Sequence, residues 1–424
     1  MKSEQIKYQL ANGLPVLVTP MPYMRSASAG IFIRSGSVYE TEQNNGIAHF
    51  IEHMLFKGSK TRTAEQIAEE SDRLGGTLNA YTAEECTCIY IKTLGEDVKE
   101  ALELIADIAC QPVFDPEAIE KEKNVVQEEI INAEDNPEDA VQEMLMKNMF
   151  SNHPVGQPVL GSAEIVQGFD AESLRRFYEE RYSAENMLIS VAGNVEPEEI
   201  RRLLDASPLA RVPAGKQGDR ETRPKGAPCG SGIFYSFRDV EQLQMVAGYP
   251  CVDRRDDRLF AFLLLSQILS GDSSSRLFRR LREDHGLVYN VDAAAAEYED
   301  TGVFLITTGF SPSNYGKVTR IIREEILDIL ENGILPGELD RAKRTTQTAL
   351  ILEQESTSSV MSVAGKRGIF RVEMTGEEVL RRIDALTCEE VRAAAQLAFG
   401  DPGREAVALV GDAEGMVLKG ILAE

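Results

Sequence analysis

Two of the four histidines in this chain stand four residues apart, with an acid directly before the second one. In the stretch GIAHFIEHMLFKGS they are His49, Glu52 and His53. Residues four apart on an α-helix share one face with Cβ atoms about 5–6 Å apart, so both imidazoles can reach one cation. Zinc binds nitrogen and carboxylate oxygen, and a catalytic zinc keeps three protein ligands and a water. Glu52 is offset from the pair and is placed to take a proton from that water, so the third ligand must come from elsewhere.

A histidine pair on a helix can also be a hydrogen-bonded pair without metal, and short motifs of this kind occur by chance. Two features favour the metal. The remaining residues of the stretch are strongly apolar, so the helix is expected to be packed, and its polar groups then need partners. An acid-rich helix, EKEKNVVQEEIINAEDNPEDAV, follows in the sequence, and its Glu122 and Glu129 share a face two turns apart. Spacing alone does not choose between Glu128 and Glu129 as the third ligand.

Several elements must position this motif. Asn44 or Asn45 is expected to cap the start of its helix, and Gly58 to end it. A strand pair around Asn12-Gly13 is predicted to precede it as a hairpin. The patterns that follow predict a helix over 64–74, a strand pair over 77–94, a helix over 97–110 and a helix beginning at Asp115-Pro116.

The second half of the chain repeats this order of elements, which predicts an internal duplication of one α+β unit. When Gly271 is aligned with Gly58, the three polar residues of the motif face Phe262, Leu265 and Ser266. The chemistry is therefore expected in the first copy only. We predict a catalytic zinc-binding domain over 1–210, a linker rich in proline, glycine and charge over 211–231, and a degenerate homologous domain over 232–424.

Composition narrows the classes of function. The chain has 424 residues and a formal net charge of −24, which argues against nucleic-acid binding. It has no apolar run long enough for a membrane span and no pattern of a signal peptide, so a cytoplasmic location is expected. The six cysteines lack the spacing of a disulfide framework, so reduced thiols are expected.

Four blocks, in order, resemble the M16 metallopeptidases, the inverted zincins, which include pitrilysin, insulin-degrading enzyme and the mitochondrial processing peptidase. The blocks are HFIEHMLFKGS, GGTLNAYTAEE, EKEKNVVQEEI and SSRLFRRLREDHGLVYNV. H-x-x-E-H is the signature of this group, and the resemblance covers nearly the whole chain. It implies an α+β fold of two tandem units, each an antiparallel-rich mixed β-sheet packed with helices, as in the LuxS/MPP-like metallohydrolase fold.

The resemblance also implies roles for individual residues. One zinc ion per chain would be held by His49, His53 and Glu129, with Glu52 as the general base and Glu122 as a supporting acid beside the site. In the second half, an arginine and a tyrosine would lie on the substrate and the developing oxyanion, and a strand in the first half would bind the substrate as an added β-strand. These residues are Arg282 and Tyr289, and Asn79, Ala80 and Thr82.

The function implied is that of a zinc-dependent endopeptidase acting on peptides or unfolded segments, with basic ones weakly favoured by the acidic charge. Short members of the family commonly pair, so we expect a homodimer, or a heterodimer with a related chain. Arg282 and Tyr289 then serve the zinc of either their own chain or the other subunit, and the sequence leaves both arrangements open. A partner-dependent or non-proteolytic subunit is the main alternative, and a hydrolase of another bond or a metal-binding module is a further one. His153 and His285 lack partner spacing and are expected at the surface.

Overall fold

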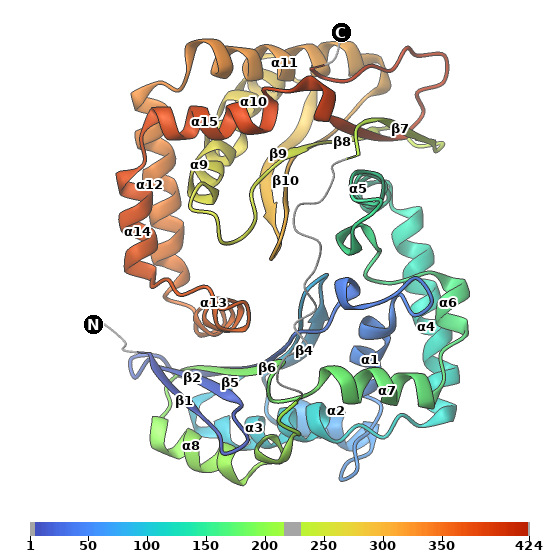
Figure 1. Ribbon diagram of the computed structural model, residues 1–424, viewed down its shortest axis with the longest axis vertical. Helices are drawn as coiled ribbons and strands as arrows, with labels where there is room; N and C mark the ends of the chain where they lie inside the picture. The colour runs from blue at the N-terminus through green and yellow to red at the C-terminus, as the bar shows by residue number, and fades with distance from the viewer. Residues whose placement is uncertain (1–4, 216–229, 423–424) are drawn as a thin grey trace. The chain divides into compact units, whose positions relative to one another are not determined.

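The computed structural model describes residues 5–215 and 230–422, so most of the predicted linker lies outside the described residues. Within these ranges the chain forms two compact units, each built around one β-sheet (Figure 1). Of the described residues, the first unit comprises 5–131, 157–215 and 351–373, and the second comprises 132–156, 230–350 and 374–422.

The first unit contains a six-stranded sheet in the order β1-β2-β6-β3-β5-β4. All neighbours pair antiparallel except β2 and β6, which are parallel. The predicted hairpin is confirmed, with Gly13 at a positive φ in its turn, as is the predicted strand pair that ends the sheet. The strands are β1 (Ile6–Gln9), β2 (Pro15–Pro20), β3 (Ser26–Ile33), β4 (Thr77–Thr82), β5 (Thr87–Leu94) and β6 (Met187–Gly193).

Helices cover both faces of this sheet. Successive strand residues point to opposite faces, and in β3 Ile31 and Ile33 belong to the core shared with α1 and α3, whereas Phe32 packs with α13 on the other side. The helices of this unit are α1 (Ile47–Leu55), α2 (Ala64–Arg73), α3 (Val98–Cys110), α4 (Pro116–Asp135), α6 (Ala163–Gln167), α7 (Ala171–Arg181), α8 (Pro197–Ala206) and α13 (Thr357–Ile369). The four helices expected between residues 46 and 135 are therefore present.

The second unit contains a five-stranded sheet in the order β7-β11-β8-β10-β9, with β7 and β11 parallel and the other neighbours antiparallel. This order and these directions match β2-β6-β3-β5-β4 of the first sheet, which confirms the predicted duplication. The strands are β7 (Gly232–Phe237), β8 (Leu243–Pro250), β9 (Val288–Glu297), β10 (Gly302–Phe310) and β11 (Ala406–Gly411).

One face of the second sheet packs on α9, α11 and α15, and the other on α5. A π-helical turn, η5 (Arg279–Asp284), follows the short α10. The helices of this unit are α5 (Pro137–Met149), α9 (Leu259–Ser270), α10 (Arg276–Phe278), α11 (Tyr315–Asn332), α12 (Pro336–Glu353), α14 (Gly376–Ala385) and α15 (Cys388–Phe399).

The compact units differ from the contiguous domains 1–210 and 232–424 in two exchanged helices. α5, from the first half of the chain, packs on β8 and β11, while α13, from the second half, packs on β3 and β6. Each of these helices buries its apolar face there, Leu145 and Met149 in α5, Met361 and Ile369 in α13. An amphipathic pattern predicts a helix that packs on one face, but it does not say which of two similar sheets the helix covers.

Candidate active site

The helix that carries the histidine pair is fixed at its start by a buried carboxylate. Gly46, at a φ of 92°, is the N-cap of α1, so the expected caps Asn44 and Asn45 are not used. Instead, Glu40 accepts hydrogen bonds from the backbone N–H groups of Gly46 and Ala48 at 2.7 and 2.8 Å, and from the side-chain amide of Asn45 at 2.8 Å. Burial raises the pKa of Glu40 to about 7, although these donors act to lower it. A negative group is favoured at this end of a helix, so Glu40 anchors α1 whenever it is ionised.

Two histidines and one glutamate converge next to this helix. The Nε2 atoms of His49 and His53 lie 3.2 Å apart, and Oε2 of Glu129 lies 3.7 and 3.3 Å from them. One ligand atom from each of the three side chains lies within 4.8 Å of the other two. Glu128 is exposed on another face of α4, so the structure brings Glu129 to the histidines, as the family pattern implied.

Glu122 holds His53 from the side opposite Glu129. Oε1 of Glu122 lies 2.9 Å from Nδ1 of His53, and its Oε2 lies 2.7 Å from Nζ of Lys57. A hydrogen bond from Nδ1–H to a carboxylate fixes the tautomer in which Nε2 carries a free lone pair. Glu122 therefore contacts a predicted ligand, where the resemblance implied a supporting acid, and Lys57 balances its charge.

The ligand types of this cluster and the neutral state of His49 suit a cation. Burial, together with the neighbouring His53, lowers the pKa of His49 to about 3, so His49 is neutral near pH 7. Burial also acts to lower the pKa of His53, but the hydrogen bond to Glu122 and the charges of Glu129, Glu122 and Glu52 outweigh it and raise that pKa. Two imidazole nitrogens and a carboxylate oxygen that face one another are the ligand set that zinc accepts at a catalytic site. The residues present therefore fit a zinc ion.

Glu52 lies beside the ligands and contacts strand β4 rather than the histidine nitrogens. The hydroxyl of Thr82 donates to its Oε2 at 2.6 Å. Burial raises the pKa of Glu52, although the hydrogen bond from Thr82 and the charge of His53 act to lower it. A carboxylate with a raised pKa next to a metal site is suited to accepting and returning a proton.

The predicted substrate strand is the edge strand of the first sheet. β4 pairs with β5 on one side and ends the sheet on the other, and α1 packs against it. Asn79, Ala80 and Thr82 all lie on this strand, and Oδ1 of Asn79 accepts the backbone N–H of Ala80 at 2.9 Å. An edge strand of this kind can pair with an extended peptide.

Arg282 and Tyr289 lie together in the second unit. Nη1 of Arg282 donates to the backbone oxygen of Tyr289 at 2.8 Å, and its guanidinium carbon lies 4.8 Å from the centre of the Tyr289 ring. Tyr289 is 78% exposed on the edge strand β9, the counterpart of β4. The structure therefore pairs these two residues with each other, and their role toward the histidine site stays a proposal.

The two other histidines differ from each other. His285 is exposed, as expected. The expectation for His153 is wrong, because its side chain is buried, with Nε2 3.3 Å from Oδ2 of Asp300 and Nδ1 accepting the backbone N–H of Val155 at 3.2 Å. These contacts come from the loop after α5 and the turn before β10, and a pairing so distant in sequence leaves no local pattern.

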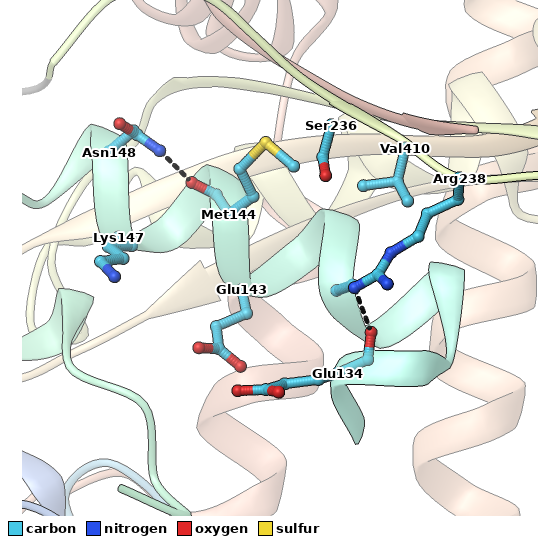
Figure 2. Close-up of a pocket in the computed structure, with 9 residues that line it drawn as sticks. Glu134, Glu143, Met144, Lys147, Asn148, Ser236, Arg238 and Val410 are labelled. Atoms are coloured by element: carbon cyan, nitrogen blue, oxygen red, sulfur yellow. Dashed lines mark hydrogen bonds between the residues drawn. The ribbon is translucent and has the colours of Figure 1, made fainter. Parts of the chain in front are cut away.

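A pocket of about 330 Å³ in the second unit contains none of the predicted site residues (Figure 2). It lies where α5 faces β7 and β11, and Arg238 donates there to the backbone oxygen of Glu134 at 3.1 Å. Its lining mixes acids and bases that are common on helix surfaces, namely Glu134, Glu143, Lys147 and Arg238.

Apart from Glu122, the sequence did not reveal the residues that support the site. Glu40 lies before the histidine motif and Lys57 after it, and neither residue was assigned a role from the sequence. Thr82 was noted, but for substrate binding rather than for its contact with Glu52. Alternation along β4 is the signal that could have shown this contact, because Leu78 and Ala80 face the core that includes α1 and Thr82 continues their row.

Comparisons with known proteins agree with this fold and this cluster. The family model described as insulinase (peptidase family M16) matches residues 16–163, and the one described as peptidase M16 inactive domain matches residues 168–346. The chain therefore belongs to peptidase family M16, and the resemblance inferred from the sequence is confirmed.

The match to two bacterial relatives spans almost the full length of this chain and of each relative. An uncharacterized zinc protease of Bacillus subtilis is 34% identical over 399 residues, which cover 93% of this chain and 95% of that protein. An uncharacterized zinc protease of Rickettsia bellii is 35% identical over 401 residues, covering 94% and 96%.

Solved structures share the fold at lower identity. A peptidase M16 inactive domain from Pseudomonas fluorescens has a TM-score of 0.89 and 21% identity, covering 98% of this chain and 100% of that one. A protease from Helicobacter pylori has a TM-score of 0.87 and 21% identity, covering 97% and 100%. Among the described residues, we find no helix with the length and apolar character that a membrane span requires.

Proposed function

We propose that this chain is a zinc-dependent endopeptidase of the inverted-zincin type, acting on peptides or unfolded segments. The observation that carries the proposal is the convergence of His49, His53 and Glu129, with Glu52 beside them. Family membership and the relatives named as zinc proteases support the same activity.

In this proposal each side chain has one task. His49, His53 and Glu129 hold one zinc ion, which when bound supplies a Lewis acid that polarises the scissile carbonyl and activates water. Glu52 takes the proton from the attacking water and returns it to the leaving amine. Glu122 keeps Nε2 of His53 directed at the ion, and Arg282 with Tyr289 stabilises the oxyanion.

The proposed substrate is an extended chain that adds to the free edge of β4. Backbone hydrogen bonds to an edge strand give affinity for extended peptides with little dependence on sequence. The formal net charge of −24 favours basic peptides through long-range attraction.

The test is zinc content together with cleavage of a quenched basic peptide library, measured on the wild type and Glu52→Gln. The wild type is expected to hold about one zinc per chain and to cleave. The variant is expected to keep zinc and to lose cleavage by about 10²–10⁴-fold, the usual contribution of a general base.

Adjacent acids on α4 provide a matched pair of controls. Glu129→Gln removes a proposed ligand and is expected to weaken zinc binding by at least about 100-fold. Glu128→Gln changes an exposed neighbour with the same chemistry and should leave zinc content and cleavage unchanged. Equal zinc content in both variants would refute the ligand assignment. Zinc in the wild type without cleavage of any peptide would instead favour a partner-dependent or non-proteolytic subunit.

We also propose that two copies of this chain pair, and that Arg282 and Tyr289 of one copy serve the zinc of the other. This assembly rests on the resemblance to short family members. In the proposed pair, the side chain of Tyr289, which is exposed in a single chain, contacts the other copy.

A further inference from the structure

Thr82 faces the helix that carries the proposed base. It is the last residue of β4, and side chains two apart on a strand point to the same face. Ala80 is buried in the core that includes α1, and Leu78 packs against that core. Thr82 continues this row toward α1, which lies beside β4 (Figure 1). Its side chain thus points to the helix, while the free backbone groups of β4 remain at the sheet edge.

The hydroxyl of Thr82 has one proton, and its neighbours decide where that proton goes. Oγ1 of Thr82 lies 2.6 Å from Oε2 of Glu52 and 3.3 Å from Oγ1 of Thr87. The hydroxyl of Thr87 donates its own proton to the backbone oxygen of Ser35 at 3.0 Å. A hydroxyl donates once, and a distance of 2.6 Å is typical of a hydroxyl that donates to a carboxylate. Thr82 therefore donates to Glu52, and the contact with Thr87 is a secondary one.

We propose that Thr82 is a positioning residue for Glu52, a role that rests on the proposed peptidase function. Its hydroxyl anchors Oε2 and so fixes the carboxylate, which leaves Oε1 as the oxygen that exchanges a proton with the reacting groups. Among the described residues, no hydrogen bond to Oε1 is present. This side-chain role differs from the substrate contact expected from the sequence, and substrate pairing then involves only the backbone of β4.

The two roles predict different kinetics. Loss of a positioning hydrogen bond leaves the substrate bound but the base misplaced, so kcat falls. Loss of a substrate contact raises KM instead. Thr82→Val keeps the shape of the side chain and removes the hydroxyl, whereas Thr82→Ser keeps the hydroxyl.

The experiment compares zinc-loaded wild type, Thr82→Val, Thr82→Ser and Thr93→Val on one peptide from the library. Thr93, on the neighbouring strand β5, is buried and its hydroxyl donates to a backbone oxygen away from Glu52, so Thr93→Val controls for the loss of a buried hydroxyl. Zinc affinity by competition with a chelator and the crystallographic position of Glu52 are measured in parallel.

We expect Thr82→Val to lower kcat by about 10–100-fold with KM within about twofold, the range for residues that orient catalytic groups. Thr82→Ser should restore kcat to within a few fold of the wild type, and Thr93→Val should match the wild type. Zinc affinity should stay the same in all four proteins, and the Glu52 carboxylate should leave its place only in Thr82→Val.

An unchanged kcat in Thr82→Val, with or without a raised KM, would overturn the proposal. If the wild type binds zinc and cleaves nothing, the proposed peptidase function is refuted. The positioning role of Thr82 is then tested by the crystallographic position of Glu52 alone. A displaced carboxylate in Thr82→Val then supports the positioning role, and an undisplaced one refutes it.

Discussion

His53 is held by charged groups on two sides. Glu122 receives its Nδ1–H and Glu129 faces its Nε2, so the ring is fixed in orientation before any ion binds. The same acids raise the pKa of His53 above its ordinary value. At a pH below this raised pKa, a metal must therefore displace a proton from the ring.

Zinc binding should consequently depend on pH through His53. Below the raised pKa of His53 one proton leaves for each zinc bound, so zinc affinity should rise about tenfold per pH unit and level off above that pKa. Glu122→Gln removes the main group that raises the pKa. Its affinity should level off at a lower pH and, on that plateau, be about 10–100-fold weaker because the ring loses its support.

Chelator competition between pH 5.5 and 8.5 measures both curves. Glu128→Gln, which keeps the charge partners of His53, should reproduce the wild-type curve. Parallel curves for the wild type and Glu122→Gln would show that His53 does not control zinc binding.

At this scale the sequence was more informative about the ligands than about the residues that support them, of which only Glu122 was named. Helical spacing alone predicted that His49 and His53 meet, because four residues make about one turn. The choice of Glu129 over Glu128 needed either the family pattern or the direction of α4. Thr82 meets Glu52 across 30 residues of sequence, and His153 meets its acidic partner across 147, so neither pairing could be read from the sequence around one residue.

Helix α13 is seated on the first sheet through small and hydroxylated residues. Thr357 lies 2.9 Å from the hydroxyl of Ser28, and Ser190 donates to the backbone oxygen of Met361 at 2.8 Å. Gly365 faces the ring of Phe32 so closely that a Cβ there would lie 2.0 Å from a ring carbon. The glycine thus sets the distance between helix and sheet.

Gly365→Ala should push α13 away from the sheet. We expect the free energy of unfolding to fall by about 1–3 kcal/mol, because overpacking forces side chains and backbone to shift. Gly316→Ala is the control, since its Cβ would meet nothing within 4 Å and alanine favours a helix by up to about 1 kcal/mol. Urea denaturation of the wild type and both variants measures these differences. If Gly365→Ala were as stable as Gly316→Ala, Phe32 would move aside without cost.

The order of elements was predictable and the pairing of helices with sheets was not. Turns and repeated patterns predicted the hairpin, the strand pair β4–β5 and the four helices α1 to α4, together with the repetition of this order in the second half. The exchange of α5 and α13 follows from packing between elements far apart in sequence. An amphipathic pattern predicts that a helix packs on one face but does not say which sheet it covers.

For the whole molecule, the proposed pairing of two chains can be tested by complementation. Glu52→Gln and Arg282→Ala are co-expressed with different tags, and dimers that contain one chain of each kind are purified. If Arg282 acts on the other subunit, one of the two sites is intact, and about half of the wild-type activity is expected. If Arg282 acts within its own chain, both sites are defective and the activity is lost.

Mixed dimers of the wild type and Glu52→Gln are the control, because they should keep about half of the activity in either case. Failure to recover any mixed dimer would refute the pairing itself.

The exchange of α5 and α13 also sets an order in time during synthesis. The strands of the first sheet are complete once Gly193 has left the ribosome, but the face that bears Phe32 stays uncovered until Ile369 follows. α5 likewise waits for β11. Both units therefore complete their packing late in synthesis and at about the same time, instead of one after the other. A chain that stops before residue 369 would already contain every proposed zinc ligand, on a sheet covered on one face only.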